Sequence, residues 1–182
     1  MNNPVDIQIL SMMKDPSFRD EGFLKLMNSY KEPIYSHIRR LVVSHEDAED
    51  ILQETFINVY RFADSFKGES NVFTWLYRIA TNECIKHYRK NNKWINKAVK
   101  ITERMDNELS GFDTENSDTI LFKFQQAILQ LSEKQRIVFN LRYYDELSYE
   151  DIGKILNSSV NTVKTNYHYA SVKVKQYLID HA

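Results

Sequence analysis

The chain contains little glycine and proline, and their scarcity limits the folds that it can adopt. Of 182 residues, 4 are glycine and 3 are proline, together about 4 %, whereas globular proteins average roughly 12 %. Sandwiches and barrels need many tight turns, and low-complexity filaments are often rich in these residues. The scarcity of glycine and proline therefore argues against these classes. The hydrophobic content of 42 % is enough for one large or two small packed cores.

Cysteine and long apolar runs are also scarce. Cys84 is the only cysteine, so no intrachain disulfide can form and a thiolate zinc site lacks its usual ligands. No apolar run approaches the roughly 20 residues that cross a bilayer, and the start of the chain, MNNPVDIQIL, is unlike an export signal. We predict a cytoplasmic protein that does not insert into membranes.

Signatures of catalysis are missing from the sequence as well. The 5 histidines are scattered without metal-ligand spacing, and no glycine-rich phosphate loop or nucleophile elbow occurs. We therefore expect no metal, no cofactor and no enzymatic activity. The 24 basic and 25 acidic residues leave a net charge of −1, so only local clusters of charge can indicate a partner.

Apolar residues spaced three and four apart are abundant, which is the pattern of packed amphipathic helices. One such stripe covers residues 23–42, and Pro33 predicts a break there into two consecutive helices. Ser44 and Asp47 fit a capping box for a helix that ends near residue 63. Ser70 is the predicted cap of a further helix that ends near residue 90.

Residues 91–118 change character and indicate a linker. The part from residue 101 to 118 has six acidic residues against one arginine, so it cannot bury much surface. A structureless loop of about 28 residues is unusual inside one compact domain. We divide the chain into a domain of residues 1–92, a linker of 93–118 and a domain of 119–182.

The last part of the chain has the pattern of a helix-turn-helix. Two helices are predicted over residues 120–141, the second capped by Ser132. Ser148 with Asp151 then opens a short helix, and a polar turn, residues 157–159, precedes a longer helix. The apolar stripe of this last helix consists of Val160, Val163, Tyr167, Ala170, Val174 and Leu178. The predicted fold is all-α, with two small helical domains joined by a flexible linker.

The outward residues of the last helix are of the types that bind a DNA major groove. They are Asn161, Thr162, Lys164, Thr165, Asn166 and His168. Asparagine pairs bidentately with adenine, and threonine and lysine reach base edges or phosphates. An ordinary solvated helix is the alternative, although the absence of acids between residues 161 and 177 disfavours it.

A second basic stretch suits single-stranded nucleic acid. Its cations are Arg78, Lys86, Arg89, Lys90, Lys93, Lys97 and Lys100, against one acid, Glu83. They are interleaved with Trp75, Tyr77, Tyr88 and Trp94, and bases stack on exposed rings beside cations. The alternatives are that Trp75 and Tyr88 belong to the core and that the cations form a solvated face.

An acidic cluster precedes this stretch. Residues 45–54 contain five acids and no lysine or arginine, namely Glu46, Asp47, Glu49, Asp50 and Glu54. Such a surface repels nucleic acid and fits a protein partner with basic residues. Acids that complement the dipole of a helix N-terminus are the alternative explanation.

Several motifs resemble those of the bacterial sigma-70 family of RNA polymerase sigma factors. The segments DAEDILQETF (47–56), FKGES (66–70) and TWLYRIATN (74–82) resemble region 2, and LSYEDI (147–152) with NTVKT (161–165) resembles region 4. The short linker leaves no room for the middle domain of larger members, which indicates the extracytoplasmic-function (ECF) group.

The resemblance implies partners and roles for individual residues. The helix from Asp47 to Arg61 would dock on the β′ clamp helices of core polymerase, through Asp47, Asp50, Gln53, Glu54 and Asn58. Residues Phe66, Lys67, Gly68, Ser70, Arg78, Asn82 and Lys86 would bind the −10 element, with a flipped base in the loop of residues 66–70. Region 4 would rest on the β flap and contact the −35 element through Asn161, Thr162, Lys164, Thr165, His168 and Tyr169. An anti-sigma factor is a further partner that the resemblance allows.

Three positions depart from the family pattern. Many members have glycine where Asn161 stands and arginine where Asn166 and Tyr169 stand. The loss of two cations should weaken phosphate anchoring, so a −35 sequence cannot be transferred from relatives.

We therefore predict a sigma factor that binds core polymerase, recognises −10 and −35 elements, assists −10 melting and performs no covalent chemistry. One alternative is a helix-turn-helix regulator that binds DNA alone, with residues 1–92 as a ligand or dimerisation module. Another is an adaptor that uses only protein contacts.

Overall fold

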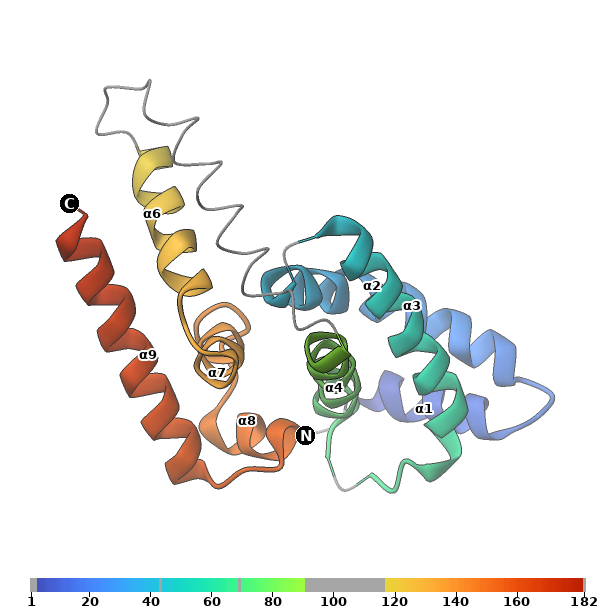
Figure 1. Ribbon diagram of the computed structural model, residues 1–182. Helices are drawn as coiled ribbons and strands as arrows, with labels where there is room; N and C mark the ends of the chain where they lie inside the picture. The colour runs from blue at the N-terminus through green and yellow to red at the C-terminus, as the bar shows by residue number, and fades with distance from the viewer. Residues whose placement is uncertain (1–2, 43, 69, 91–116, 182) are drawn as a thin grey trace. The chain divides into compact units, whose positions relative to one another are not determined.

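The computed structural model describes residues 3–42, 44–68, 70–90 and 117–181, and over these ranges the chain is helical and contains no strand (Figure 1). The described residues belong to two compact units. The prediction of an all-α fold with two small helical domains is confirmed. The linker boundaries stay a prediction, because residues 91–116 lie outside the described ranges. In chain order the elements are α1 (Pro4–Lys14), α2 (Arg19–Leu41), α3 (His45–Phe62), the 3₁₀ helix η1 (Ala63–Ser65), α4 (Val72–Lys90), α6 (Ser117–Leu129), α7 (Glu133–Tyr143), α8 (Tyr149–Leu156) and α9 (Val160–Asp180).

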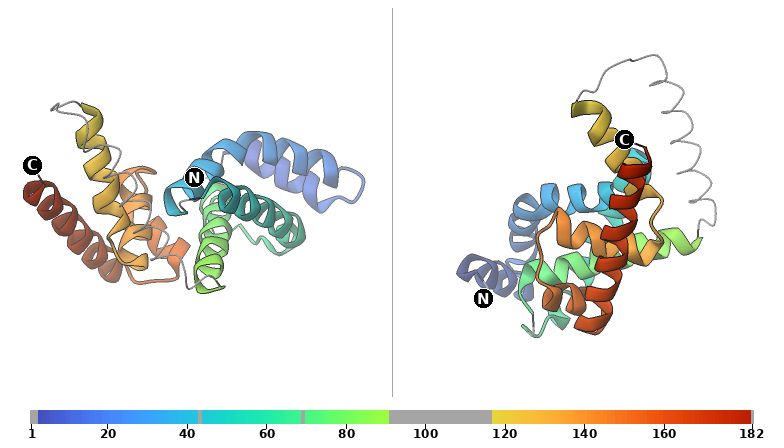
Figure 2. Two further views of the ribbon diagram at one scale, coloured as in Figure 1. Left: turned by 45° about the horizontal axis from the view of Figure 1, so that its top comes forward. Right: turned by 90° about the vertical axis from the view of Figure 1, so that its left-hand side faces the viewer.

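In the N-terminal unit, α2 packs against both α1 and α3 (Figures 1 and 2). The apolar stripe predicted for α3 is buried as expected, and α4 adds a buried stripe of its own. These core residues are Ala48, Ile51, Leu52, Phe56 and Val59 of α3 with Val72, Leu76 and Ala80 of α4. The spacing of three and four residues in the sequence therefore identified the faces that meet in the core.

Helix α2 runs unbroken through Pro33, so the prediction of two consecutive helices is wrong. A proline inside a helix removes one backbone hydrogen bond and crowds the preceding turn, which costs about 3 kcal/mol. Leu26 before the proline and Ile34 and Ile38 after it are fully buried, and each such side chain contributes about 1.5–3 kcal/mol. Burial on both sides outweighs the local penalty and keeps the two halves in one helix.

Helix α1 was not anticipated, because the predicted helical pattern began only at residue 23. The signal for it is a capping asparagine followed by proline at the first helical position. The Oδ1 atom of Asn3 accepts a hydrogen bond from the backbone N–H of Val5 at 3.1 Å. Ile9, Leu10 and Met13 then bury one face of the helix.

Gly22 allows α1 and α2 to approach closely. A Cβ atom at this position would lie 2.9 Å from the Cβ of Met12 and 2.9 Å from the backbone nitrogen of Met13. Backbone cannot retreat as a flexible side chain can, so α1 would have to move. The small residue is therefore required by the crossing of the two helices.

We expect Gly22→Ala to lower the free energy of unfolding by about 1–3 kcal/mol, the usual effect of overpacking. In an open helix the same change would stabilise the protein by about 0.5–1 kcal/mol. Urea unfolding measures the difference, with Asn28→Ala on the exposed side of α2 as the control. Equal or greater stability of Gly22→Ala would contradict the close approach.

Two predicted helix starts are confirmed. The backbone N–H of Asp47 donates to Ser44 Oγ at 3.3 Å, and that of Asp151 donates to Ser148 Oγ at 3.1 Å. Ser148 Oγ also lies 2.7 Å from the carboxylate of Asp151. These bonds satisfy backbone donors that a helix leaves unpaired at its first turn.

Two other predicted caps need correction. The start of α4 is capped by Asn71 instead of Ser70, since Asn71 Oδ1 accepts the backbone N–H of Thr74 at 2.6 Å. Serine and asparagine both cap helices well, so residue type does not distinguish Ser70 from Asn71. The helix begins at the buried Val72, and this places Asn71 at the N-cap. Ser132 stands at the N-cap of α7, but its side chain makes no capping hydrogen bond.

In the C-terminal unit, α6 and α7 pack along the long helix α9 (Figures 1 and 2). Helix α8, a turn with Asn157 at φ 48° and α9 form the predicted helix-turn-helix. Val163, Ala170 and Val174 of the predicted stripe are buried, and the other three members are half-buried. The core cluster that joins α6, α7 and α9 consists of Ala127, Ile128, Leu131, Phe139, Ala170 and Val174.

Candidate DNA and polymerase interfaces

The residues predicted to contact the −35 element share the exposed surface of α9. All six side chains are exposed, namely those of Asn161, Thr162, Lys164, Thr165, His168 and Tyr169. The helix starts at Ser159, whose Oγ accepts the backbone N–H of Thr162 at 3.1 Å. Its first turn contains no acid, so the positive end of the helix dipole is not neutralised locally and favours a phosphate.

Two polar residues near the start of α9 form hydrogen bonds within the helix. Thr162 Oγ1 lies 2.8 Å from Ser159 Oγ, and Asn166 Nδ2 donates to the carbonyl oxygen of Thr162 at 2.9 Å. Asn166 is half-buried, although the sequence predicted it to point outward. Thr162 and Asn166 thus form hydrogen bonds within the first turns of α9, whereas the exposed Lys164 lies beside the ring of Tyr149 in α8.

Tyr149, the first residue of α8, supports this surface and was not identified from the sequence. Lys164 Nζ lies 5.7 Å from the centre of its ring, and the guanidinium carbon of Arg142 lies 5.2 Å from it. The ring also meets Tyr167 edge-on at 6.0 Å. Cations are attracted to aromatic faces at these distances, so Tyr149 limits the positions that Lys164 can adopt.

The loop predicted to hold a flipped base follows η1. Lys67 and Gly68 are exposed and Ser70 is half-buried, whereas Phe66 is only 9 % exposed and packs its ring 5.1 Å from that of Trp75. Phe66 therefore forms a wall of this region instead of offering a free face. Gly68 has φ 76°, a left-handed conformation that glycine adopts without strain.

On α4 the predicted −10 residues form a single stripe. Arg78, Asn82 and Lys86 are exposed and spaced four residues apart, so they follow one face of the helix. Lys86 Nζ pairs with the carboxylate of Glu83 at 2.6 Å. The stripe therefore presents amide and guanidinium donors together with a partly neutralised lysine.

The expected interleaving of exposed rings with these cations is wrong for Tyr77, which is 2 % exposed and stacks on Phe73 at 4.1 Å. Tyr88 is also buried, and Trp75 is half-buried. The rings of α4 thus belong mainly to the core, as the alternative held. The predicted contributions of Lys93, Trp94, Lys97 and Lys100 fall outside the described residues.

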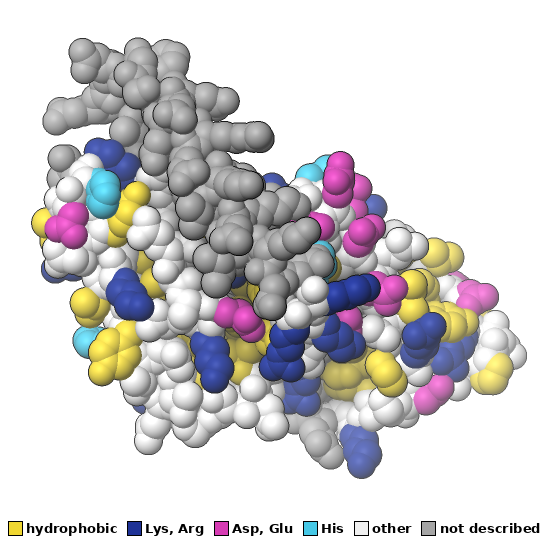
Figure 3. Space-filling model, in the orientation of Figure 1, with side chains coloured by type: hydrophobic (Ala, Val, Ile, Leu, Met, Phe, Trp, Pro, Cys, Tyr) yellow, Lys and Arg dark blue, Asp and Glu magenta, His cyan; other side chains and the backbone are white. Residues whose placement is uncertain are grey.

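The acidic residues of α3 divide between an inner edge and an outer surface. On the inner edge, Asn58 Nδ2 donates to Glu83 Oε1 at 3.0 Å, and Asp47 lies 3.7 Å from His87 Nε2. Both Asn58 and Asp47 are half-buried. On the outer surface Asp50, Gln53 and Glu54 are exposed, and Figure 3 shows acidic side chains gathered over the N-terminal half of α3.

An apolar groove between α2 and α3 borders this outer surface and was not predicted from the sequence. Its volume is about 560 Å³, and Gln53 lies on its rim. The apolar walls are Phe23, Met27, Leu52, Phe56, Ile57 and Tyr60, with Lys31, Glu49 and Arg61 also lining it. Apolar surface next to exposed carboxylates is typical of a protein-binding surface.

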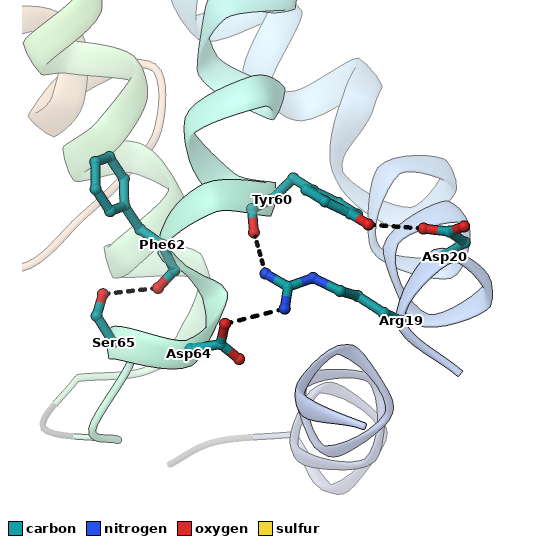
Figure 4. A network of polar contacts seen from close by, with 6 residues as sticks. All are labelled: Arg19, Asp20, Tyr60, Phe62, Asp64 and Ser65. Carbon is teal, nitrogen blue, oxygen red and sulfur yellow. Dashed lines mark hydrogen bonds and ion pairs between the residues drawn. The ribbon is translucent and has the colours of Figure 1, made fainter. Parts of the chain in front are cut away.

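A polar network ties the start of α2 to the end of α3 (Figure 4). The two terminal nitrogens of Arg19 donate to the Asp64 carboxylate at 3.0 Å and to the carbonyl oxygen of Tyr60 at 2.9 Å. The phenol of Tyr60 donates to Asp20 at 2.8 Å, and this hydrogen bond raises the pKa of Tyr60. The network satisfies a C-terminal carbonyl of α3 just before the loop that contains Phe66.

Comparison with known proteins decides the family. The sequence matches Sigma-70 region 2 over residues 26–94 and Sigma-70 region 4 over residues 121–174. It is 38 % identical to the ECF RNA polymerase sigma factor SigW of Bacillus subtilis over 173 residues, which cover 88 % of this chain and 90 % of SigW. The chain belongs to the ECF RNA polymerase sigma factors. As a sigma factor it directs promoter-specific initiation of transcription with core RNA polymerase.

Further relatives agree with this family. The ECF sigma-E factor of Escherichia coli is 33 % identical over 155 residues, 80 % of each chain. CnrH, solved in complex with the cytosolic domain of CnrY, has the same fold, with a TM-score of 0.71 at 17 % identity over 98 % of this chain and 99 % of that one. The sigma factor RpoE of Bartonella quintana, solved with the anti-sigma factor NepR, has a TM-score of 0.66 at 24 % identity over 86 % and 96 % of the two chains.

Helix α1 of this sigma factor lies before the residues matched to region 2.

In the described parts of the chain, no helix has the length and apolar character needed to cross a bilayer. The same residues contain no group of three or more His, Cys, Asp or Glu side chains that could hold a metal ion.

Proposed function

We propose that the sigma factor divides its task among three surfaces. The outer surface of α3 (Asp50, Gln53 and Glu54) binds core polymerase, the loop of residues 66–70 with the α4 stripe binds the −10 strand, and α9 reads the −35 duplex. The observation that carries this assignment is the segregation of exposed charge. Carboxylates cover the outer side of α3, whereas the α4 stripe carries Arg78, Asn82 and Lys86, and the exposed residues in the first half of α9 include Lys164 and no acid.

At the −10 element, Lys67 and the α4 stripe bind the separated strand. Flipping a base out of the stack costs a few kcal/mol, which contacts in the pocket must return. The half-buried Trp75 and the packed ring of Phe66 supply a rigid apolar wall, while Arg78 and Lys86 attract the phosphates. Single-stranded DNA is thus favoured over a closed duplex at this surface.

At the polymerase, the exposed carboxylates of α3 and the apolar groove beside them form one continuous contact surface with the β′ clamp helices. Asp47 and Asn58 contribute indirectly, since their side chains engage His87 and Glu83 of α4. Region 4 rests on the β flap. An anti-sigma factor is a fitting regulator, because two proteins of the same fold were solved with the partners CnrY and NepR. The protein is a cytoplasmic initiation factor without catalytic activity of its own.

Run-off transcription with core polymerase and a promoter library tests the proposal. We expect transcripts from promoters that share −10 and −35 sequences, and none from core polymerase alone. A regulator that acts without polymerase would instead protect an operator from cleavage in the absence of core enzyme. Tight and selective duplex binding by the isolated protein would therefore overturn the proposal.

Gly68 offers a local test of the −10 loop. We expect Gly68→Ala to reduce promoter melting by roughly tenfold, because a left-handed backbone costs a residue with a Cβ about 1–2 kcal/mol. Apart from its two chain neighbours, no described residue has an atom within 4 Å of the position of an added Cβ, so the effect is conformational and not a clash. Gly68→Asn should retain more activity, since asparagine tolerates this conformation. Permanganate footprinting of the −10 region measures melting, and equal losses in both variants would contradict the explanation.

A further inference from the structure

A cleft separates α1 from the loop that precedes α4. It has a volume of about 410 Å³, and its walls come from both segments of the N-terminal unit. The loop side consists of Phe66, Lys67 and Gly68 together with Val72, the first residue of α4, and the α1 side consists of Ile7, Leu10, Ser11 and Lys14. Ile7 is 55 % exposed, so the α1 side offers apolar surface to a ligand.

Lys14 joins the two sides of the cleft. Its Nζ atom donates to the carbonyl oxygen of Phe66 at 3.0 Å, across 52 positions of sequence. The N–H of Phe66 is bound in turn to the carbonyl of Ala63 at 3.2 Å, and its ring packs on Trp75. Both backbone groups of Phe66 are therefore fixed, and Gly68, two residues later, is the first position with a left-handed conformation.

The Arg19 network holds the same segment from its other end. Arg19 binds Asp64 and the carbonyl of Tyr60 (Figure 4), so the segment of residues 60–66 is anchored twice to the α1–α2 region. Lysine in the last turn of a helix often serves only the helix dipole. Lys14 instead reaches a carbonyl of the loop, which indicates a role in placing that loop.

We propose that α1 forms one wall of the site that takes an unpaired base of the −10 strand, and that Lys14 is a positioning residue for this site. The inference rests on the proposed function of the loop. The chemistry fits a nucleobase, because the apolar Ile7 and the side-chain-free Gly68 line the same cleft, while Lys67 is exposed beside them for a phosphate. A loop held in one place discriminates among bases better than a loop that adapts to each of them.

The test uses holoenzyme formed with core polymerase on a promoter taken from the library. At the −10 position with the strongest preference, open-complex formation is measured for all four bases. We expect Lys14→Met to reduce the ratio of the best base to the others by roughly threefold to tenfold, the range for loss of one orienting hydrogen bond. Core affinity and −35 preference should not change, and Lys14→Arg should restore part of the ratio.

Lys25→Met is the matched control, since Lys25 is exposed on α2 and pairs with Glu21 at 2.8 Å. It removes the same charge without touching the loop, so its base ratio should equal that of the unmodified protein. A base ratio unaltered by Lys14→Met, or an equal loss for all four bases, would overturn the inference.

A second variant keeps the test independent of how well Lys14→Met folds. Ser11 is exposed on the α1 side, so Ser11→Trp fills the cleft while Lys14 remains in place. We expect it to suppress the fluorescence rise of 2-aminopurine at the flipped position while −35 binding persists. A normal rise would contradict the role of α1. If the unmodified protein itself shows no −10 base preference, the proposed function fails. If the unmodified protein shows the preference and both variants keep it unchanged, only the inference about α1 is overturned.

Discussion

Asp50→Lys is expected to weaken the binding of core RNA polymerase by about tenfold to a hundredfold. Asp50 is exposed in the second turn of α3, where the helix dipole has little influence because its effect fades beyond the first turn. The dipole therefore explains Glu46 and Asp47 but not Asp50 or Glu54. Placing a cation opposite a basic partner is unfavourable, and the expected loss corresponds to about 1.4–2.8 kcal/mol, because each 1.4 kcal/mol is a factor of ten in affinity.

Fluorescence anisotropy of labelled protein titrated with core enzyme measures this affinity. Glu32→Lys is the matched control, since Glu32 is exposed on α2 and the charge change is identical. An equal loss in both variants would assign the effect to net charge instead of the α3 surface. Unaltered affinity of Asp50→Lys would refute the assignment of this surface to polymerase.

The fold was predictable where the hydrophobic period and the caps agreed. Helix α3 has both the Ser44 cap and an apolar stripe from Ala48 to Val59, and the structure contains both. Pro33 misled the prediction because a local penalty is visible in the sequence, whereas the burial of Ile34 and Ile38 that offsets it depends on the helices that pack on α2 being in place. Tertiary packing, and not the local penalty of Pro33, therefore determines that α2 is one continuous helix.

The sequence predicted which helices carry the candidate surfaces, but not how the individual side chains on those helices are oriented. The motifs placed Asn58 and Asp50 on the same helix, yet Asn58 turns to Glu83 and Asp50 to solvent. Phe66 has the ring that a base needs, but Trp75 already covers it. Such orientations depend on the neighbours of each residue in three dimensions, which spacing along one helix does not contain.

Contacts between distant segments were the features that sequence reasoning missed. Tyr149 beneath Lys164 and Lys14 beside Phe66 join residues from different elements. Neither residue belongs to a periodic pattern, and both are of types that occur on ordinary surfaces. The net charge of −1 likewise does not reveal the separate charged surfaces. The acids of α3 cancel the cations of α4 and α9 in the total, although these charges lie on different helices.

Lys164→Glu is expected to reduce output from −35-dependent promoters by tenfold or more while affinity for core polymerase is retained. Lys164 is exposed in the second turn of α9, and its position is limited by the ring of Tyr149 at 5.7 Å. Loss of a good base contact costs about 1–3 kcal/mol, and the new carboxylate adds repulsion from the phosphates. Run-off transcription measures output, and the salt dependence of promoter binding should become less steep.

Lys173→Glu on the same helix is the appropriate control for Lys164→Glu. Residue 173 follows nine positions later, half a turn away around the helix, and its Nζ atom already donates to Gln135 Oε1 at 3.1 Å. The charge change is the same, so a general loss of attraction between α9 and DNA would lower output in both variants. A loss confined to Lys164→Glu assigns the −35 contact to the face that Lys164 shares with Asn161 and His168. If Lys164→Glu instead weakened core binding and left promoter selectivity intact, this face of α9 would belong to the polymerase interface.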